Sequence, residues 1–193
     1  MILSSERLTL LSAKPALAKA VLDYYLRNRE FLAPFDPIHE ESFYILAYQR
    51  RALRRDAAMA RRGEGWAFYI TPNDEPGKII GRVVLSGVVW GSFCSCFLGY
   101  KLDKDYLNRG YMTEAIGLVT AWGFEQGLHR IEANIMPRNL PSLRVAEKCG
   151  FQNEGMSPQY LQINGRWEDH VHMVKLNPDW ELYIPFRGGW TGT

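Results

Sequence analysis

The sequence has little of what marks secreted, membrane-spanning or disulfide-bonded chains. It holds three cysteines, Cys94, Cys96 and Cys149, and no C-x-x-C pair, so we expect reduced thiols. No apolar run approaches the roughly 18 residues that a membrane helix needs. The N-terminus lacks a basic stretch followed by an apolar core and a cleavage site, which argues against a signal peptide. These absences predict a cytoplasmic protein without a membrane partner.

A strong charge of either sign is also missing, because the net charge is +2 over 193 residues. This balance gives no general argument for nucleic-acid binding. The apolar fraction of 47% and the length are typical of one globular domain with a full hydrophobic core. No internal repeat or low-complexity segment interrupts the chain.

One stretch, 41–62, departs from this balance with six arginines against two acidic residues. The pairs Arg50/Arg54 and Arg51/Arg55 are spaced i, i+4, so one face of a helix over this stretch is strongly basic. Two interpretations are open. The face is a solvated outer surface, or it docks an acidic or RNA-containing partner.

Local patterns predict an α/β domain over 1–176 and a C-terminal tail over 177–193. Three strands with tight connections, one of them the turn sequence TPNDEPGK, predict an antiparallel meander. The dipeptide Asn164–Gly165 between two alternating runs predicts a hairpin over 159–176. The meander consists of the expected strands 66–71, 79–90 and 93–102, and two further strands are expected at 7–12 and 130–136. The expected helices are 15–25, 41–62, 112–126 and 141–151.

The strand at 93–102, the helix at 112–126 and the strand at 130–136 form a crossover unit. Such a unit makes its two strands parallel neighbours, so the sheet turns from antiparallel to parallel at one point. Ligands prefer the carboxyl ends of strands at a discontinuity of this kind.

The loop DYLNRGYMTEA, 105–115, lies at this discontinuity, directly before the crossover helix. The N-terminal N–H groups of a helix can bind phosphate. Gly110 permits a positive φ or a close backbone approach, and Arg109 can add a charged contact. The alternative is an ordinary glycine-led helix start without a ligand.

Three motifs here resemble consecutive motifs of the GNAT acyltransferase superfamily: LGYKL, NRGYMTEA, and N-x-x-S-x-R-x-x-x-K-x-G-F over 139–151. The segments NREFLAPFDP, GWAFYI, ANIMPRN, EGM, QYLQINGRWEDHVHM and NPDW resemble its Rim branch, closest to the RimJ-type ribosomal-protein-alanine N-acetyltransferases. The resemblance covers nearly the whole chain. It implies an α/β single-domain GNAT fold, a mixed central sheet splayed between its fourth and fifth strands with flanking helices, and acetyl-CoA as cosubstrate.

The resemblance also implies which residues hold the coenzyme. Backbone groups of Tyr100, Lys101 and Leu102 would pair with the pantetheine arm inside the splay, and Asn139 would hydrogen-bond that arm or an ordered water. The backbone N–H groups that would hold the pyrophosphate are those of Asn108, Arg109, Gly110, Tyr111, Met112 and Thr113.

Two loop positions depart from the family pattern. Leu107 offers no polar side chain, and Met112 is larger than the usual residue. Because the pyrophosphate contact is mainly made by the backbone, we expect acetyl-CoA binding to survive both changes.

Catalytic positions depart as well. Many family members carry a tyrosine acid where this chain has Ala146, and a glutamate where it has Phe97. Ser142 resembles a serine of some Rim enzymes and is the candidate that protonates the departing thiolate; its alternative role is to satisfy backbone donors at a helix start. Glu132 resembles a base position in a related Rim enzyme, and its alternative is a solvated charge near a strand end.

Acid–base chemistry favours an N-terminal acceptor over a lysine side chain. An α-amino group has a pKa of roughly 7.7–8.0, against ~10.4 for lysine, so much of it is already nucleophilic near neutral pH. Positioning of the amine against the thioester then supplies most of the rate. A weakly defined base is therefore compatible with this acceptor.

Four aromatic residues are candidates for the acceptor channel: Phe31, Phe35, Tyr160 and Trp167. As alternatives, Phe31 and Phe35 staple the two N-terminal helices, and Tyr160 and Trp167 form a cross-strand packing pair. No metal is expected. His170/His172 and Cys94/Cys96 are each two apart on a strand, but a zinc site needs further convergent ligands.

The sequence therefore predicts an acetyl-CoA-dependent N-acetyltransferase that works by direct attack of an amine on the thioester. By resemblance, the acceptor is the N-terminal alanine of a ribosomal protein, the fifth of the small subunit. This partner could be met on an assembling subunit, with RNA contact through the basic helix 41–62. Two alternatives remain: a small-molecule amine acceptor such as an antibiotic or polyamine, and a non-catalytic coenzyme A-binding assembly factor.

Overall fold

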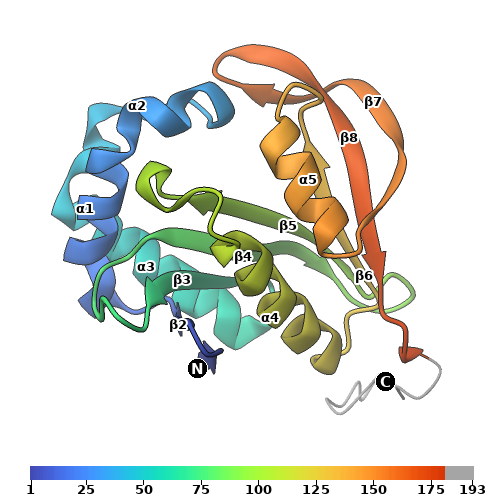
Figure 1. The fold of residues 1–193 in the computed structure, drawn as a ribbon, viewed down its shortest axis with the longest axis horizontal. Coiled ribbons are helices and arrows are strands. Elements are labelled where there is room, and N and C mark those ends of the chain that lie inside the picture. Colours follow the sequence, from blue (N-terminus) through green and yellow to red (C-terminus); the bar gives the residue numbers. More distant parts are fainter. Residues whose placement is uncertain (181–193) are drawn as a thin grey trace, which may run out of the picture.

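The computed structural model describes residues 1–180, which form an eight-stranded mixed sheet with helices on both faces (Figure 1). The strand order is β1-β2-β3-β4-β5-β6-β8-β7. The described strands are β1 (Ile2–Ser4), β2 (Leu8–Ser12), β3 (Trp66–Pro72), β4 (Gly81–Val89), β5 (Ser95–Leu102), β6 (Arg130–Ile135), β7 (Gln152–Ile163) and β8 (Arg166–Leu176). The described α-helices are α1 (Ala18–Arg27), α2 (Arg29–Leu32), α3 (Leu46–Arg62), α4 (Tyr111–Glu125) and α5 (Leu140–Lys148). Short 3₁₀ turns are η1 (Pro15–Leu17), η2 (Ala33–Phe35), η3 (Glu41–Tyr44) and η4 (Lys104–Tyr106).

Neighbouring strands of the described sheet pair antiparallel, except that β5 and β6 pair parallel. The predicted change of direction at one crossover is therefore confirmed. Sequence patterns did not predict β1, so the parallel pair is the fifth and sixth strands in chain order rather than the fourth and fifth.

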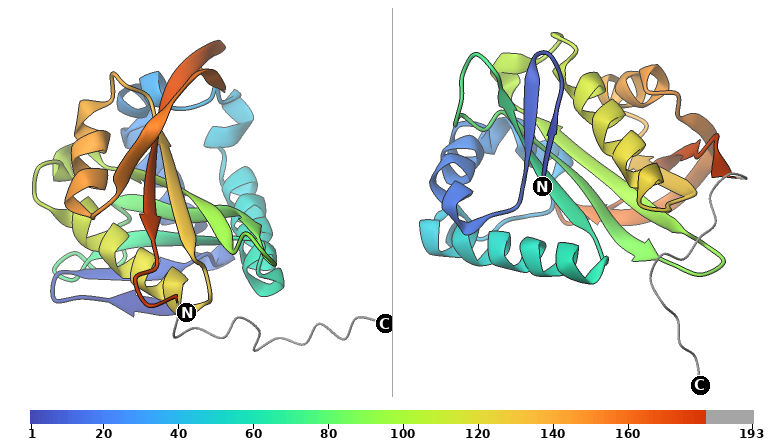
Figure 2. Two further views of the ribbon diagram at one scale, coloured as in Figure 1. Left: turned by 90° about the vertical axis from the view of Figure 1, so that its right-hand side faces the viewer. Right: turned by 90° about the horizontal axis from the view of Figure 1, so that it is seen from below.

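The two faces of the sheet carry separate hydrophobic clusters. Helices α4 and α5 cover one face, where Ile116 and Val119 are fully buried, and α1 and α3 cover the other, where Val21 and Leu53 are fully buried (Figure 2). We call these the α4–α5 face and the α1–α3 face. Every residue of β3 is buried because helices cover both sides of that strand.

The predicted helix over 41–62 is divided in two. Ile45 has an extended backbone with φ −119° and separates η3 from α3. The side-chain amide of Gln49 donates to the carbonyl oxygen of Phe43 at 2.6 Å, which satisfies a backbone group that the break leaves without a helical partner. The helix ends at Gly63 with φ 67°, as the sequence predicted.

The C-terminal hairpin turns at Asn164–Gly165 as predicted, but β7 begins at Gln152 rather than at 159. Two register shifts, between Asn153 and Met156 and between Ser157 and Leu161, interrupt its alternation and hid the strand from pattern reading. The division at residue 176 stays a prediction, and 181–193 of the expected tail lie outside the described residues. No helix in the described range is long and apolar enough to cross a membrane.

Candidate active site

A slot opens between β5 and β6, where the sheet changes direction. The two strands pair only over Ser95–Phe97 and Arg130–Glu132. Beyond these residues β5 pairs with β4 as far as Leu102, and β6 pairs with β8 as far as Ile135. The facing edges of the two strands therefore carry backbone N–H and C=O groups free to bind an extended, amide-containing ligand as another strand would. Tyr100, Lys101 and Leu102 lie on this free edge, and the predicted splay is confirmed.

The loop before α4 forms a cradle of backbone donors. Gly110 has φ 80° and Asn108 has φ 59°, and the first intrahelical bond runs from the N–H of Glu114 to the carbonyl of Gly110 at 3.0 Å. Among the described residues, the N–H groups from Asn108 to Thr113 donate to no protein acceptor. These donors meet the positive end of the helix dipole, which is a favourable place for phosphate.

Arg7 holds this loop, although nothing in the local sequence predicts it. Its Nη1 donates to the carbonyl of Arg109 at 3.0 Å, its Nε donates to Glu114 at 2.8 Å, and its guanidinium lies over the ring of Tyr111. Partial burial acts to raise the pKa of Glu114, but hydrogen bonds from Ser5 and Arg7 hold that pKa below its usual value. Arg7 thus positions the cradle and adds a positive charge beside it.

The two off-pattern loop residues leave the donors accessible. The Met112 side chain is buried in the core on the α4–α5 face, so its size does not fill the cradle, and Leu107 is partly exposed. The Cys149 thiol donates to the carbonyl of Thr113 at 3.5 Å. This contact ties the end of α5 to the start of α4 beside the slot.

Two hydroxyl groups meet across the slot on the α4–α5 face. Ser142 Oγ donates to the Tyr100 hydroxyl at 2.7 Å, and that hydroxyl donates to the Ser142 carbonyl at 2.9 Å. Burial raises the pKa of Tyr100 well above its usual value, so the phenol keeps its proton. Asn139 caps α5 by accepting from the Ser142 N–H at 3.3 Å. Sequence reasoning assigned Tyr100 only a backbone role, and the structure adds its side chain.

Glu132 lies on the opposite face of the sheet from Ser142. Ile131 is buried toward α4 and α5, and the alternation of β6 turns the next side chain to the α1–α3 face. One Glu132 oxygen lies 2.8 Å from His172 Nδ1, and the other accepts from Arg130 at 3.0 Å. The side chain is only 15% exposed, so it is not the solvated strand-end charge considered above.

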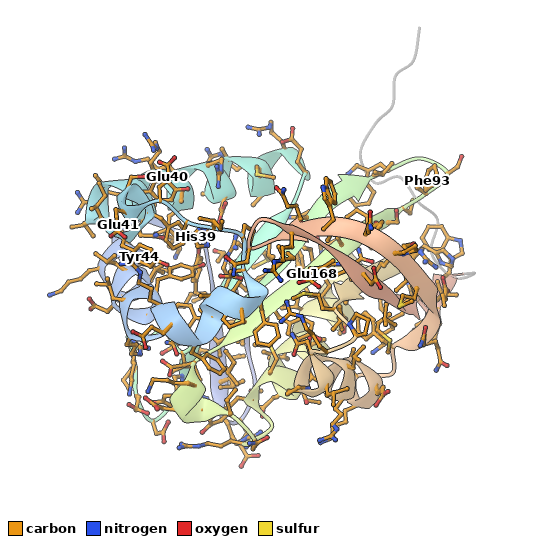
Figure 3. The ribbon with its side chains drawn as sticks, turned by 90° about the horizontal axis from the view of Figure 1, so that it is seen from above. His39, Glu40, Glu41, Tyr44, Phe93 and Glu168 are labelled. Carbon is orange, nitrogen blue, oxygen red and sulfur yellow. The ribbon has the colours of Figure 1, made fainter. Side chains whose placement is uncertain are left out.

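A small pocket opens near the far end of the slot on the α1–α3 face. It has a volume of about 190 Å³ and is lined by α1, α2, the segment after η2 and the hairpin turn, with Tyr25, Tyr44 and Asn164 among its residues. The Lys101 ammonium reaches the wall of this pocket and pairs with Asp36 at 2.5 Å. Figure 3 looks down on this region, with Tyr44 and Glu168 labelled.

Arg138 connects the two segments that border the pocket. Its guanidinium donates to Glu168 of β8 at 2.9 Å and to the carbonyl of Pro34 in η2 at 3.3 Å, and it lies over the Phe35 ring. The residue comes from the loop between β6 and α5, and its role depends on partners distant in sequence. The segment ANIMPRN contains this residue, but its contacts could not be found by motif reading.

The four aromatic candidates have different surroundings. Phe35 lies under Arg138, with 5.6 Å from guanidinium carbon to ring centre, and Tyr160 packs edge-on against His172 at 4.9 Å. Phe31 is 36% exposed on α2, and Trp167 is 61% exposed. The register places Trp167 opposite Gln162, so Trp167 and Tyr160 do not face each other directly across the hairpin.

Within the described residues, no three His, Cys, Asp or Glu side chains converge on a metal position. Cys94, Cys96 and Cys149 are free and buried. The two histidines of β8 bond to protein groups instead, His170 to the carbonyl of Glu168 and His172 to Glu132.

A mixed sheet that separates beside a donor-rich helix start offers a strand edge to an extended, amide-containing ligand and a cradle of N–H donors to its phosphate groups. The family model described as "Acetyltransferase (GNAT) domain" matches residues 7–152, so the chain belongs to the GNAT acetyltransferases. The protein is an N-acetyltransferase, as predicted.

Three similar proteins sharpen this assignment. The probable N-acetyltransferase YjcK of Bacillus subtilis (strain 168) is 42% identical over 154 residues, 79% of this chain and 84% of the relative. The ribosomal protein uS5-alanine N-acetyltransferase of Escherichia coli (strain K12) is 36% identical over 180 residues, 92% of each chain. The structure of Mycobacterium smegmatis RimJ in complex with CoA-disulfide has a TM-score of 0.83 and 25% identity, covering 93% of this chain and 84% of that chain. The expected Rim branch is thereby confirmed.

Proposed function

We propose that this enzyme acetylates the N-terminal alanine of ribosomal protein uS5, with acetyl-CoA as acyl donor. The observation that carries the proposal is the slot between β5 and β6, which has hydroxyl groups on one face and ionisable groups on the other. The cradle of backbone N–H groups before α4 lies beside this slot. Two relatives support it by their names, since one acts on uS5-alanine and the other binds a coenzyme A disulfide.

The residues of this chain divide the work between the two faces. The cradle from Asn108 to Thr113 binds the pyrophosphate, and the free strand edge from Tyr100 to Leu102 binds the pantetheine arm. The bound thioester supplies an activated acetyl group. The acceptor amine approaches from the α1–α3 face, and its nitrogen attacks the carbonyl carbon directly.

The departing thiolate leaves toward the α4–α5 face, where Tyr100 and Ser142 can return a proton. Both hydroxyl protons point within the pair, so one hydroxyl must rotate to donate. Since a thiol of pKa near ~8.5 is a tolerable leaving group, this proton transfer assists the reaction rather than making it feasible.

Thiol release from acetyl-CoA tests the proposal. The acceptors are a peptide beginning with alanine, the same peptide with a blocked N-terminus and a free lysine, and the small amine spermidine. We expect release only with the free N-terminal alanine. Release only with spermidine would favour a small-molecule acetyltransferase, and release with neither the peptide nor spermidine would favour the non-catalytic assembly factor.

The basic face of α3 supports an RNA contact on an assembling small subunit. The arginines at 50, 51, 54, 55, 61 and 62 are exposed. Of these six, only Arg62 forms an ion pair within the described residues, with Glu64. Such a face attracts phosphate through charge rather than sequence. We expect Arg50→Glu with Arg54→Glu to slow acetylation of uS5 in ribosomal particles several-fold, without changing the rate on free peptide.

A matched charge reversal on the opposite side of the sheet, Lys148→Glu with Lys175→Glu, serves as the control. Both rates should stay near those of the unmodified enzyme. Equal particle rates for the two double variants would exclude α3 as the RNA contact.

A further inference from the structure

The residue between α1 and α2 is Asn28, which begins the segment NREFLAPFDP. It is fully buried, although asparagine is mostly an exposed residue. The backbone leaves the helical region there, with φ −111° and ψ 9°, and the carbonyl of Asn28 accepts the first hydrogen bond of α2 from Leu32 at 2.9 Å. A buried polar side chain at such a break needs hydrogen-bond partners of its own.

Both ends of the Asn28 side-chain amide are bonded to backbone groups. Nδ2 donates to the carbonyl of Tyr24 in α1 at 2.9 Å. Oδ1 accepts from the N–H of Lys104, the first residue of η4, at 3.0 Å. The first N–H groups of a helix have no partner within it, so Asn28 satisfies a donor that η4 leaves free. Asn28 and Lys104 are 76 residues apart in the chain, and we call their contact the α1–η4 joint.

An ion pair reinforces the α1–η4 joint. Arg27 Nε donates to Asp103 at 2.5 Å, and the Arg27 guanidinium also bonds the carbonyl of Ile79. Asp103 is fully buried, and its other oxygen accepts from the N–H of Asp105 at 3.1 Å. Burial acts to raise the pKa of Asp103, but its hydrogen bonds hold that pKa below the usual value, so the pair with Arg27 is ionic. The end of α1 is thus fixed to the start of η4 at two neighbouring positions.

One side of the joint leads to the coenzyme-binding residues. Asp103 directly follows Leu102, where the free edge of β5 ends. Only Leu107 separates η4 from the cradle. The cradle is also held from its far side by Arg7, so the joint is not its only support.

The other side of the joint leads to the pocket on the α1–α3 face. The segment that follows Asn28 lines this pocket with Leu32, Ala33 and Asp36. Asp36 also pairs with Lys101 on the free edge of β5. This segment therefore lies on the face from which the proposed acceptor approaches, and Asn28 stands where it meets the coenzyme side.

We propose that Asn28 is a positioning residue, which sets where the acceptor-side segment lies relative to the bound coenzyme. This rests on the proposed acetyl transfer to an N-terminal amine. Direct attack requires the amine nitrogen about 3–3.5 Å from the thioester carbon, and a misplacement of about 1 Å can cost about a hundredfold in rate. Because Asn28 is buried, it acts through the backbone groups that it bonds rather than by touching a substrate.

A substitution at Lys104 breaks the joint without changing Asn28. Lys104→Pro removes the N–H that Asn28 accepts, and proline suits the first residue of a helix. The preceding Asp103 has φ −64° and ψ 136°, which is the conformation that a residue before proline prefers. Lys104→Ala is the matched control, because it keeps the N–H and removes only an exposed side chain that pairs with Asp105.

Thiol release at saturating acetyl-CoA and alanine peptide gives kcat, and calorimetric titration gives the Kd of coenzyme A. For Lys104→Pro we expect kcat to fall at least about tenfold while Kd changes less than about threefold, because Arg7 still holds the cradle. Lys104→Ala should keep both values. Asn28→Ala should lose about as much kcat as Lys104→Pro. Combining the two should add no further loss, because both remove the same hydrogen bond.

Urea unfolding establishes that each variant is folded under the assay conditions. Should Lys104→Pro not fold, Asn28→Ala is compared with Gln49→Ala, which removes another buried side-chain amide bonded to a backbone carbonyl and should keep its kcat. Equal kcat values in that comparison overturn the proposal.

A folded Lys104→Pro variant that is less stable but has an unchanged kcat assigns the bond a purely structural role and overturns the proposal. Losses that multiply in the double variant overturn it too. An unmodified enzyme that releases no thiol with any amine overturns the proposed function as well, so the two failures are distinguishable.

Discussion

The α4–α5 face of the slot and the α1–α3 face differ in the kind of group they offer. The first offers backbone amides from Asn108 to Thr113 and the paired hydroxyls of Ser142 and Tyr100, of which the buried Tyr100 phenol has a raised pKa. The second offers ionisable side chains, Glu132 and His172, drawn from separate strands. A coenzyme that is the same in every turnover can be bound by backbone groups, whereas proton transfer from an acceptor needs side chains that can gain and lose a proton.

The largest expected effect is on coenzyme binding and comes from a substitution in the cradle. Gly110→Val forces a β-branched residue into φ 80°, and a strain of about 2 kcal/mol corresponds to roughly 30-fold weaker coenzyme binding. Arg109→Ala removes only an exposed side chain and should cost less than about fivefold. Calorimetric titration with coenzyme A measures both, and a larger loss for Arg109→Ala would contradict a cradle built from backbone amides.

A smaller effect is expected from the hydroxyl pair. Tyr100→Phe combined with Ser142→Ala should lower kcat about tenfold, less than the ~10²–10⁴ typical of general acid–base catalysis, because the thiolate is a tolerable leaving group. Coenzyme affinity should change little. Tyr24→Phe is the matched control, since the buried Tyr24 hydroxyl has no partner in the described structure. An unchanged kcat in the double variant would assign the pair a purely structural role.

The smallest effect concerns the support of the cradle by Glu114. Because the folded-state pKa of Glu114 lies below its usual value, its carboxylate stabilises the fold above the unfolded pKa of about 4.3, and this contribution disappears as the pH falls through the lowered value. Glu114→Gln should therefore cost about 1 kcal/mol or less at pH 7. Urea unfolding of both proteins should show this difference shrinking from pH 6 to pH 3, and a difference that grows with acidity would contradict the ion pair with Arg7.

The sequence indicated the coenzyme side more fully than the acceptor side, and the reason is chain distance. The cradle and the helix that carries Ser142 are contiguous stretches with their own motifs. Arg7 and Glu114 are 107 residues apart, Glu132 and His172 are 40 apart, and His172 and Ser157 are 15 apart across a distorted strand. Such contacts arise only from sheet order and register, which local patterns do not specify.

The unpaired edges of β5 and β6 also have a consequence for the mechanics of the molecule. Local opening of the sheet should begin at these edges, because the amide groups of Leu98–Leu102 and Ala133–Ile135 have no hydrogen-bonded partner strand on the side of the slot. Coenzyme bound between the two edges would take the place of a partner strand, so β5 and β6 would become more rigid only when acetyl-CoA is bound. Amide hydrogen exchange along these two edges should therefore become slower when the coenzyme binds.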